Sequence, residues 1–143
     1  FSSSCTGQAD LETAFANVMR QSLASSGMTA ADLGHIHAHG LSCVSSDRGE
    51  AAAIRQVFGE QHPPVAAAKS QFGNLGSAGG MVELIVSVLA LNAGRLPAVL
   101  NFSTPDPISP LVVNTSADCS PGSSFLTTSI TPQGQASAIV ASL

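Results

Sequence analysis

The chain has 143 residues, of which 44% are hydrophobic and only 10% are charged, and its formal net charge is -4. This length fits one domain, which we expect to span residues 1–143, and the scarcity of charge predicts that much of its surface meets another chain or domain. The five Lys and Arg are scattered, and Trp and Tyr are absent. This composition argues against the basic and aromatic surfaces of nucleic-acid-binding proteins.

No segment has the pattern of a membrane span or of a signal peptide. The longest apolar run, Met81–Leu91, is interrupted by Glu83 and is shorter than the roughly 20 residues that a span needs. The chain does not begin with Met and lacks a basic, then apolar, leader, so we expect a piece of a longer protein. Cys5, Cys43 and Cys119 form no even framework, which predicts free thiols and a cytoplasmic location.

The chain is expected to open with a helix followed by a strand. Apolar residues at helical spacing predict a helix over Ala9–Ser26 that stops at Gly27. The sequence of Thr29–Asp32 has the form of a capping box and predicts a short turn. Beyond it, His35–Ala38 is expected to be a short strand.

The next elements repeat this order of helix and strand. A second helix, capped by Ser46 or Asp47, is expected to end at Gly59. Val65–Ala68 has the apolar run of a strand that is buried on both faces. Residues 76–93 are apolar nearly all round, which predicts a helix buried in an interior.

The last third of the chain is expected to be a loop followed by a hairpin. Residues 96–110 are rich in proline and fit no regular element. Two apolar or β-branched runs, Ser124–Ser129 and Ala136–Ala141, predict a closing hairpin. The whole order predicts an α/β fold, layered α/β/α, with a mixed, mainly parallel sheet.

Polar side chains follow both predicted strands. His39 comes directly after the first strand, and Lys69 follows the second and leads into a glycine-rich turn that contains Asn74. Because an open α/β sheet binds ligands at the carboxyl ends of its strands, we expect these groups to share one cleft. His39 is predicted to act as an acid/base or hydrogen-bond donor, Asn74 as a neutral donor, and Lys69 as the charge that orients them.

Several short runs stand in a fixed order along the chain. They are Ala-His-Gly at 38–40, Glu-Ala-Ala-Ala-Ile at 50–54, Val-Phe-Gly at 57–59, Lys-Ser-x-x-Gly-Asn at 69–74 with Gly-Gly-x-x-Glu at 79–83, and Leu-Pro-Ala-Val-Leu-Asn at 96–101. In this order they resemble the A-H-G-T-x-T, E-x-x-A-I, V-F-G, K-S-x-x-G-H-x-x-G-A-A-G-x-x-E and L-P-P-T-L-N motifs of beta-ketoacyl-ACP synthases. These are condensing enzymes of the thiolase superfamily, and the resemblance is to their C-terminal half.

The resemblance implies an acyltransferase that performs a decarboxylative Claisen condensation of acyl and malonyl thioesters, in fatty acid or polyketide synthesis. In the family, a cysteine of the N-terminal half takes the acyl group, and two histidines of the C-terminal half stabilise the enolate. His39 matches the first histidine, Asn74 stands in the place of the second, Lys69 supports the network, and Glu50 belongs to the same cluster. The chemistry requires no cofactor and no metal.

The resemblance also implies the partners of the chain. They are the N-terminal half of the same protein, thioesters of acyl carrier protein or coenzyme A, and a second synthase subunit in a homodimer or heterodimer. No nucleic acid and no membrane is expected among them. Because the chain holds no candidate for the acylated nucleophile, the piece alone is expected to be inactive.

Two departures from the motifs favour an alternative function. Leu41 replaces the threonine that follows the family's A-H-G, and in the family's G-F-G-G-T-N loop, here residues 131–136, only Gly134 is kept. These glycines let backbone approach an oxyanion. The alternative is a non-catalytic synthase homologue, comparable to a chain-length factor. A degradative thiolase fits less well, because Cys119 is too early for the cysteine that thiolases place near this loop.

Other polar residues also have a structural interpretation. The alternating His35, His37 and His39 form a metal-like pattern, but no acidic or cysteine residue is placed to complete a site, so structural polar contacts are expected. Cys43 is predicted to be a small buried residue without a helix N-terminus beside it. Glu83, on an apolar helix, requires a buried partner.

Overall fold

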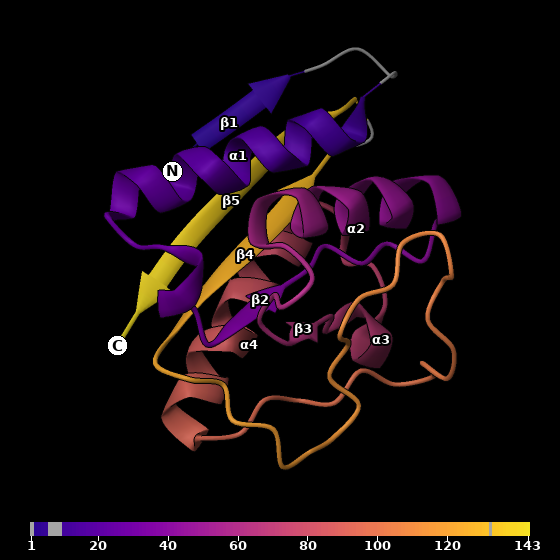
Figure 1. Ribbon diagram of the computed structural model, residues 1–143. Coiled ribbons are helices and arrows are strands. Elements are labelled where there is room, and N and C mark those ends of the chain that lie inside the picture. The colour runs from indigo at the N-terminus through magenta and orange to yellow at the C-terminus, as the bar shows by residue number, and fades with distance from the viewer. Residues whose placement is uncertain (1, 6–9, 132) are drawn as a thin grey trace.

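The computed structural model describes residues 2–5, 10–131 and 133–143. One sheet runs through the molecule, with helices on both of its faces (Figure 1). Its strands are β1 (Ser2–Cys5), β2 (His35–His37), β3 (Val65–Ala66), β4 (Ser124–Ile130) and β5 (Gln135–Ser142). The helices are α1 (Leu11–Ser26), α2 (Val44–Phe58), α3 (Lys69–Phe72) and α4 (Gly79–Ala93), with 3-10 turns at Ala30–Asp32 and Gly76–Ala78.

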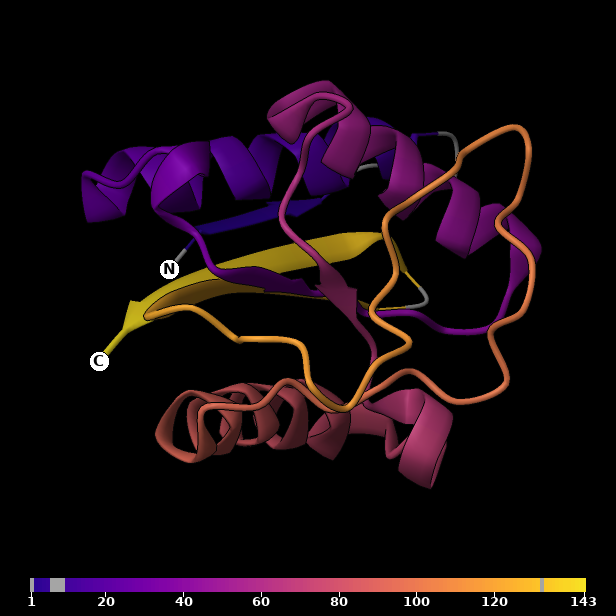
Figure 2. The same ribbon diagram turned by 60° about the horizontal axis from the view of Figure 1, so that its bottom comes forward.

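The sheet is mixed, as predicted, but among the described strands it is not mainly parallel, because its longer ladders are antiparallel; the strands lie in the order β1-β5-β4-β2-β3. β2 pairs in parallel with both β3 and β4, whereas β5 pairs antiparallel with β4 and with β1. Helices α1 and α2 cover one face and α4 covers the other (Figure 2). This gives the expected α/β/α layers and puts the carboxyl ends of β2 and β3 next to each other.

The first helix follows the sequence pattern closely. Asp10 caps α1 by accepting a hydrogen bond from the Thr13 N–H at 2.9 Å, and Gly27 ends the helix in the left-handed conformation. Ala9, where the helix was expected to begin, lies outside the described residues. Phe15 on this helix is fully buried in the core between α1, α2 and the sheet, where Ile36 of β2 also lies.

The second helix begins earlier than its predicted caps. Cys43 is the N-cap of α2, and Ser46 and Asp47 lie inside the first turn. Asp47 does not cap the helix, because its Oδ1 accepts the N–H of Leu41 at 2.9 Å instead. The carboxylate therefore holds the loop that leads into the helix. The predicted end at Gly59 is confirmed.

Helix α4 buries polar residues and exposes apolar ones, unlike the interior helix that the sequence predicted. Its buried residues include the polar Glu83 and Ser87, which face the sheet, whereas Met81, Ile85 and Leu89 are 61%, 49% and 61% exposed. The prediction of a helix enclosed on all sides is thus wrong for this chain. The polar residues face inward because they bind partners on β2 and α3, and the apolar stripe is left on the outside.

By length and composition alone, Gly76–Ala93 would suffice to cross a membrane, with a mean hydropathy of 1.4 and 28% of its residues buried. A single helix of this kind is a weak indication of a span. The absence of a membrane partner remains a prediction.

The last third of the chain is a loop followed by a hairpin, as expected. The loop that follows α4 is fixed by Asn114, whose side chain donates to the carbonyls of Leu96 and Pro97 at 3.1 and 3.0 Å. Val113 extends the edge of the sheet through a parallel bridge to Val65. The closing hairpin is confirmed as β4 and β5. Strand β1, for which the sequence offered no prediction, pairs with β5 at the opposite edge.

Candidate functional site

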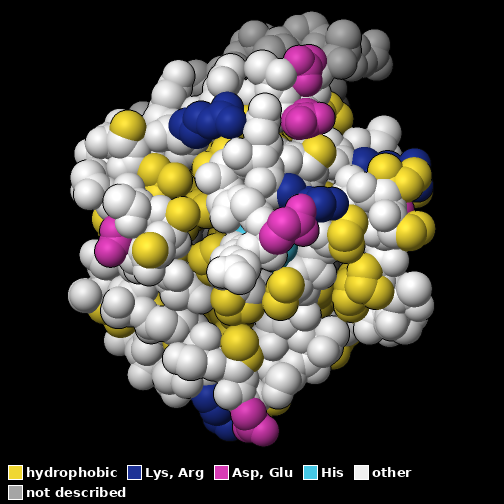
Figure 3. Space-filling view, in the orientation of Figure 1, with side chains coloured by type: hydrophobic (Ala, Val, Ile, Leu, Met, Phe, Trp, Pro, Cys, Tyr) yellow, Lys and Arg dark blue, Asp and Glu magenta, His cyan; other side chains and the backbone are white. Residues whose placement is uncertain are grey.

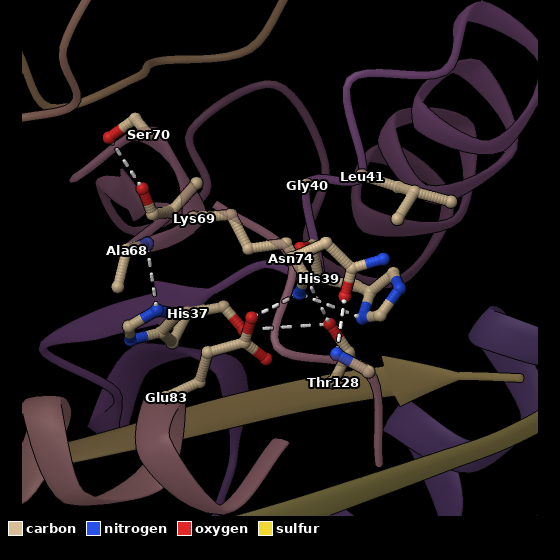
Figure 4. A network of polar contacts seen from close by, with 12 residues as sticks. His37, His39, Gly40, Leu41, Ala68, Lys69, Ser70, Asn74, Glu83 and Thr128 are labelled. Atoms are coloured by element: carbon tan, nitrogen blue, oxygen red, sulfur yellow. Dashed lines mark hydrogen bonds and ion pairs between the residues drawn. The ribbon is translucent and has the colours of Figure 1, made fainter. Parts of the chain in front are cut away.

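Lys69 stands at the centre of a buried polar network where β2 and β3 end (Figure 4). It opens α3, and only 8% of the residue is exposed. Its ammonium nitrogen forms an ion pair with Glu83 of α4, donates to the carbonyl oxygen of His39 at 2.6 Å and lies 3.2 Å from His39 Nδ1. An ammonium group has three donors, and here each one has an acceptor. The charge is therefore fixed in position.

Glu50 of α2 holds the backbone around His39 rather than the lysine. Its Oε1 accepts the His39 N–H at 2.8 Å and the Thr128 hydroxyl at 2.5 Å, and its Oε2 accepts the Gly40 N–H at 3.0 Å. Burial raises the pKa of this carboxyl, and the bonds from Gly40, Thr128 and His39 act in the opposite direction. Glu50 thereby fixes the turn that directs the His39 ring.

The contact with Lys69 settles which nitrogen of His39 carries the proton. Because the ammonium group can only donate, Nδ1 must be the acceptor, and the ring hydrogen is then on Nε2. Burial, and next the charge of Lys69, lower the pKa of His39 to about 4. At neutral pH the site thus presents a neutral imidazole with one N–H donor directed away from the lysine.

Asn74 lies in the glycine-rich turn between α3 and α4 and is exposed. Its Oδ1 accepts the N–H of Gly76 at 3.0 Å, which fixes the orientation of the carboxamide and leaves its NH₂ group as the free donor. In the view of Figure 4, the side chains of Asn74 and His39 extend into the same region. None of the hydrogen bonds found in the described part of the chain joins the two.

An open groove of about 620 Å³ lies beside this network, between α2, the end of β3 and the loop after α4. Gly40, Glu50 and Lys69 reach it, whereas His39 and Asn74 do not line it. The Arg48–Asp106 ion pair, at 2.6 Å, ties α2 to the loop across the groove. On the face shown in Figure 3, histidine atoms are visible only as small patches deep in a central hollow.

Sequence reasoning missed the role of one residue and misplaced another. Glu83, noted only as a charge that needs a partner, is the ion-pair partner of Lys69. The sequence signal for this ion pair was a lone carboxylate on an apolar helix, fourteen residues after a lysine at a strand end. Cys43, predicted to be buried, is exposed at the N-terminus of α2, and its hydrogen bond with the Ser45 hydroxyl is the largest cause of a lowered pKa.

The structural interpretation of the neighbouring histidines is supported. His35 and His37 lie on the same side of β2 and both contact Ser87 of α4, whereas His39, beyond the end of the strand, contacts Lys69. Among the described residues, no three His, Cys, Asp or Glu side chains are grouped so that they could hold a metal ion.

Comparison with known proteins places this arrangement in a family. The model for the C-terminal domain of beta-ketoacyl synthases matches residues 2–103. Nodulation protein E of Rhizobium meliloti is 32% identical over 93 residues, which are 64% of this chain and 23% of that protein. The chain therefore spans about a quarter of the length of this curated relative.

Solved structures agree with the family match. The ishigamide ketosynthase/chain length factor superposes with a TM-score of 0.87 and 27% identity, over 98% of this chain and 36% of that one. A ketosynthase in complex with its chain length factor from Xenorhabdus doucetiae gives a TM-score of 0.88 over 99% of this chain and 37% of that one; at 21% identity it shows the shared fold alone. With its mixed sheet, helices on both faces and a family match over most of its length, the chain belongs to the beta-ketoacyl synthase C-terminal domain family and has a thiolase-like fold.

Proposed function

We propose that this chain supplies His39, Asn74 and Lys69 to the active site of a decarboxylating condensing enzyme, with Glu50 fixing the His39 turn. The main support for this proposal is the contact between Lys69 and His39 Nδ1, which leaves a neutral ring with its hydrogen on Nε2. A neutral donor suits an oxygen that becomes negative only during the reaction, because it stabilises that charge without binding the ground-state carboxylate as a cation would.

The proposed reaction begins on a malonyl thioester. The bond between the α-carbon and the carboxylate breaks, carbon dioxide leaves, and the electron pair moves into an enolate whose oxygen accepts from His39 Nε2–H and from the NH₂ group of Asn74. The enolate carbon then attacks the carbonyl carbon of an acyl group held as a thioester on a cysteine. A carbon–carbon bond forms, and the cysteine leaves as a thiolate. No proton, cofactor or oxidant is consumed in these steps.

We assign the acylated cysteine to the N-terminal half, where the family resemblance puts it, and not to Cys43, although Cys43 is exposed at the start of α2. Helix α4 supports a binding surface for that half. Met81, Ile85 and Leu89 follow one another at intervals of one helical turn and form an exposed apolar stripe. A stripe of this kind on a monomer marks an interaction surface. We assign it to the N-terminal half of the same protein, since the chain covers only 23% of nodulation protein E and 36% of the ishigamide ketosynthase/chain length factor.

The remaining partners belong to the same proposal. Substrates arrive as thioesters of acyl carrier protein or coenzyme A; an acyl-carrier protein is named in complex with its ketosynthase in one similar structure. A second synthase subunit forms a homodimer or heterodimer with the full protein in the cytoplasm, and the product is a fatty acid or polyketide precursor.

A non-catalytic partner subunit is the second candidate function. Leu41 after the Ala-His-Gly motif favours it, and two of the similar structures carry a chain length factor in their names. The two functions differ in the upstream half: a cysteine at a helix start there favours the enzyme, and any other residue at that place favours the partner subunit.

The test uses the full-length protein and radiolabelled malonyl-acyl carrier protein. Release of carbon dioxide should fall by about 10²–10³-fold in His39→Ala, as it does when an oxyanion donor is removed. His62→Ala is the matched control, because His62 and His39 are each 7% exposed but His62 hydrogen-bonds only loop backbone. Mass spectrometry after incubation with an acyl donor detects acylation of the upstream cysteine. An unchanged rate in His39→Ala would refute the proposal.

A further inference from the structure

The α4 side of the sheet holds a second buried polar cluster, which the proposed reaction does not use. It consists of His35 and His37 of β2 and Ser87 of α4, each at most 1% exposed. Ser87 Oγ lies 2.7 Å from His37 Nδ1 and 3.0 Å from His35 Nε2. At the two ends, His37 Nε2 accepts the N–H of Ala68 at 3.1 Å, and His35 Nδ1 lies 2.8 Å from the carbonyl oxygen of Pro121.

With both rings neutral, only one arrangement of protons satisfies all four contacts. The Ala68 N–H can only donate, so His37 Nε2 is bare and the ring hydrogen is on Nδ1, which donates to Ser87 Oγ. The Pro121 carbonyl can only accept, so His35 carries its hydrogen on Nδ1. Its bare Nε2 then accepts the Ser87 hydroxyl hydrogen. The hydrogen bonds therefore run in one direction from Ala68 to Pro121.

We infer that this histidine bridge, formed by His37, Ser87 and His35, positions the segment that carries Lys69, so that His37 and Ser87 are positioning residues of the proposed active site. The inference rests on the proposed function. Ala68, whose N–H the bridge holds, directly precedes Lys69. His37, the last residue of β2, in turn lies two residues before His39.

Helix α4 thus holds the Lys69 segment at two points. Glu83 binds the ammonium group at the tip of the side chain, and Ser87, one helical turn further on, acts through His37 on the backbone at its base. The His35 ring is fixed further, because it stacks on Phe125 with 5.2 Å between ring centroids. A lysine fixed at both ends keeps its distance to His39 Nδ1, and with it the tautomer of the proposed catalytic ring.

A proton added to either ring is incompatible with the bridge. On His37 it would meet the Ala68 N–H, which can only donate, and on His35 it would displace the Ser87 hydroxyl hydrogen, which would have to turn away from His35. The other titratable groups at this site are Lys69 on α3, Glu83 on α4 and Glu50 on α2. A protonated His37 should therefore lose its bond from the Ala68 N–H and release the backbone that precedes Lys69.

The direct test is nitrogen NMR of the full-length protein with ¹⁵N-labelled histidine, which assigns the tautomer of each ring without any activity. We expect His35 and His37 to carry hydrogen on Nδ1 and His39 to carry it on Nε2. Assignments come from single His→Gln variants. Finding Nε2–H on either His35 or His37 in the wild-type protein at neutral pH overturns the inference.

Kinetics then test the positioning role. Ser87→Ala should lower kcat about 10-fold with KM changed less than about twofold, and should broaden or shift the His39 signal; Ser87→Thr keeps the hydroxyl and should restore both. Ser22→Ala, a serine of α1 that is also buried, is the matched control. A Ser87→Ala enzyme with normal kcat and an unchanged His39 signal overturns the inference. If instead His39→Ala is fully active, the proposed function fails while the tautomers still test the bridge.

Discussion

The two faces of the sheet pack through different kinds of side chain. Towards α1 and α2, strand and helix meet through apolar side chains, with Phe15, Ile36 and Leu126 fully buried. Towards α4, the same strands present His35, His37 and Thr127, and the helix contributes the buried Glu83 and Ser87. The alternation of side chains along a strand separates the two sets. The apolar face stabilises the domain, and the polar face, together with Glu50 of α2, orders the proposed site.

The contrast between the two faces explains why α4 buries its polar side and not its apolar stripe. A helix usually buries its apolar stripe, because removing apolar surface from water drives folding. Here the carboxylate and the hydroxyl of α4 have buried partners, which they would lose in water-facing positions, and the apolar stripe is left to bind elsewhere. Helix α4 thereby contacts the proposed site through its polar side and leaves its apolar side for a partner.

The largest expected effect comes from the outer stripe of α4. Replacing Met81, Ile85 and Leu89 together by Gln should destabilise the full-length protein, because each apolar side chain buried at an interface contributes about 1.5–3 kcal/mol. In the isolated chain the same residues face water, so the triple variant should leave stability unchanged and improve solubility. Urea unfolding of both proteins measures the difference. Equal effects in the two would contradict an interface at this stripe.

The ion pair between Lys69 of α3 and Glu83 of α4 should give the next largest effect. Lys69→Met leaves the Glu83 carboxylate buried without its partner, which typically costs about 3–5 kcal/mol. The double variant Lys69→Met/Glu83→Leu removes both charges and should recover most of that stability, but not the condensation rate. Urea midpoints and malonyl decarboxylation are the measurements. A single variant as stable as the wild type would show that the pair does not carry the α4 contact.

The polar face should also make the fold sensitive to acid. The folded pKa of His39 is about 4 and that of His37 about 3, whereas a histidine in the unfolded chain titrates near 6.5. Below about pH 6.5 the unfolded state therefore binds more protons, and stability falls as pH decreases towards these folded values. Urea midpoints between about pH 7 and about pH 5 should decrease, and His37→Asn should flatten the slope. A midpoint independent of pH would contradict this account.

The smallest effect is expected on the α2 side. Arg48→Ala removes a half-exposed ion pair with Asp106, and pairs of this kind contribute about 0–1 kcal/mol. Thermal unfolding should change little, while hydrogen exchange in the loop around Asp106 should become faster. Loss of the fold in this variant would mean that the loop contributes more to stability than its contacts indicate.

Elements with a clear local signal could be predicted from the sequence. The helix that ends at Gly27, the strand at His35, the stop at Gly59 and the closing hairpin follow from spacing and turn residues. The start of α2 could not, because Asp47 had two possible partners, and only the folded loop brings the Leu41 N–H to its carboxylate. The short strand β1 could not be predicted either. Its residues have no apolar pattern, and the strand is fixed by pairing with β5.

The residues of the proposed site could be named from their motifs, because their order and spacing survive in the sequence. Their contacts could not, because those contacts join separate elements. Glu83 binds Lys69 and Ser87 joins two histidines only after α4 is laid against the sheet, and Glu50 reaches the backbone of His39 from α2 on the other face. Local spacing fixes which side chains share a face of a helix or strand, whereas the choice between burying the apolar or the polar side of α4 depends on partners that are distant along the chain.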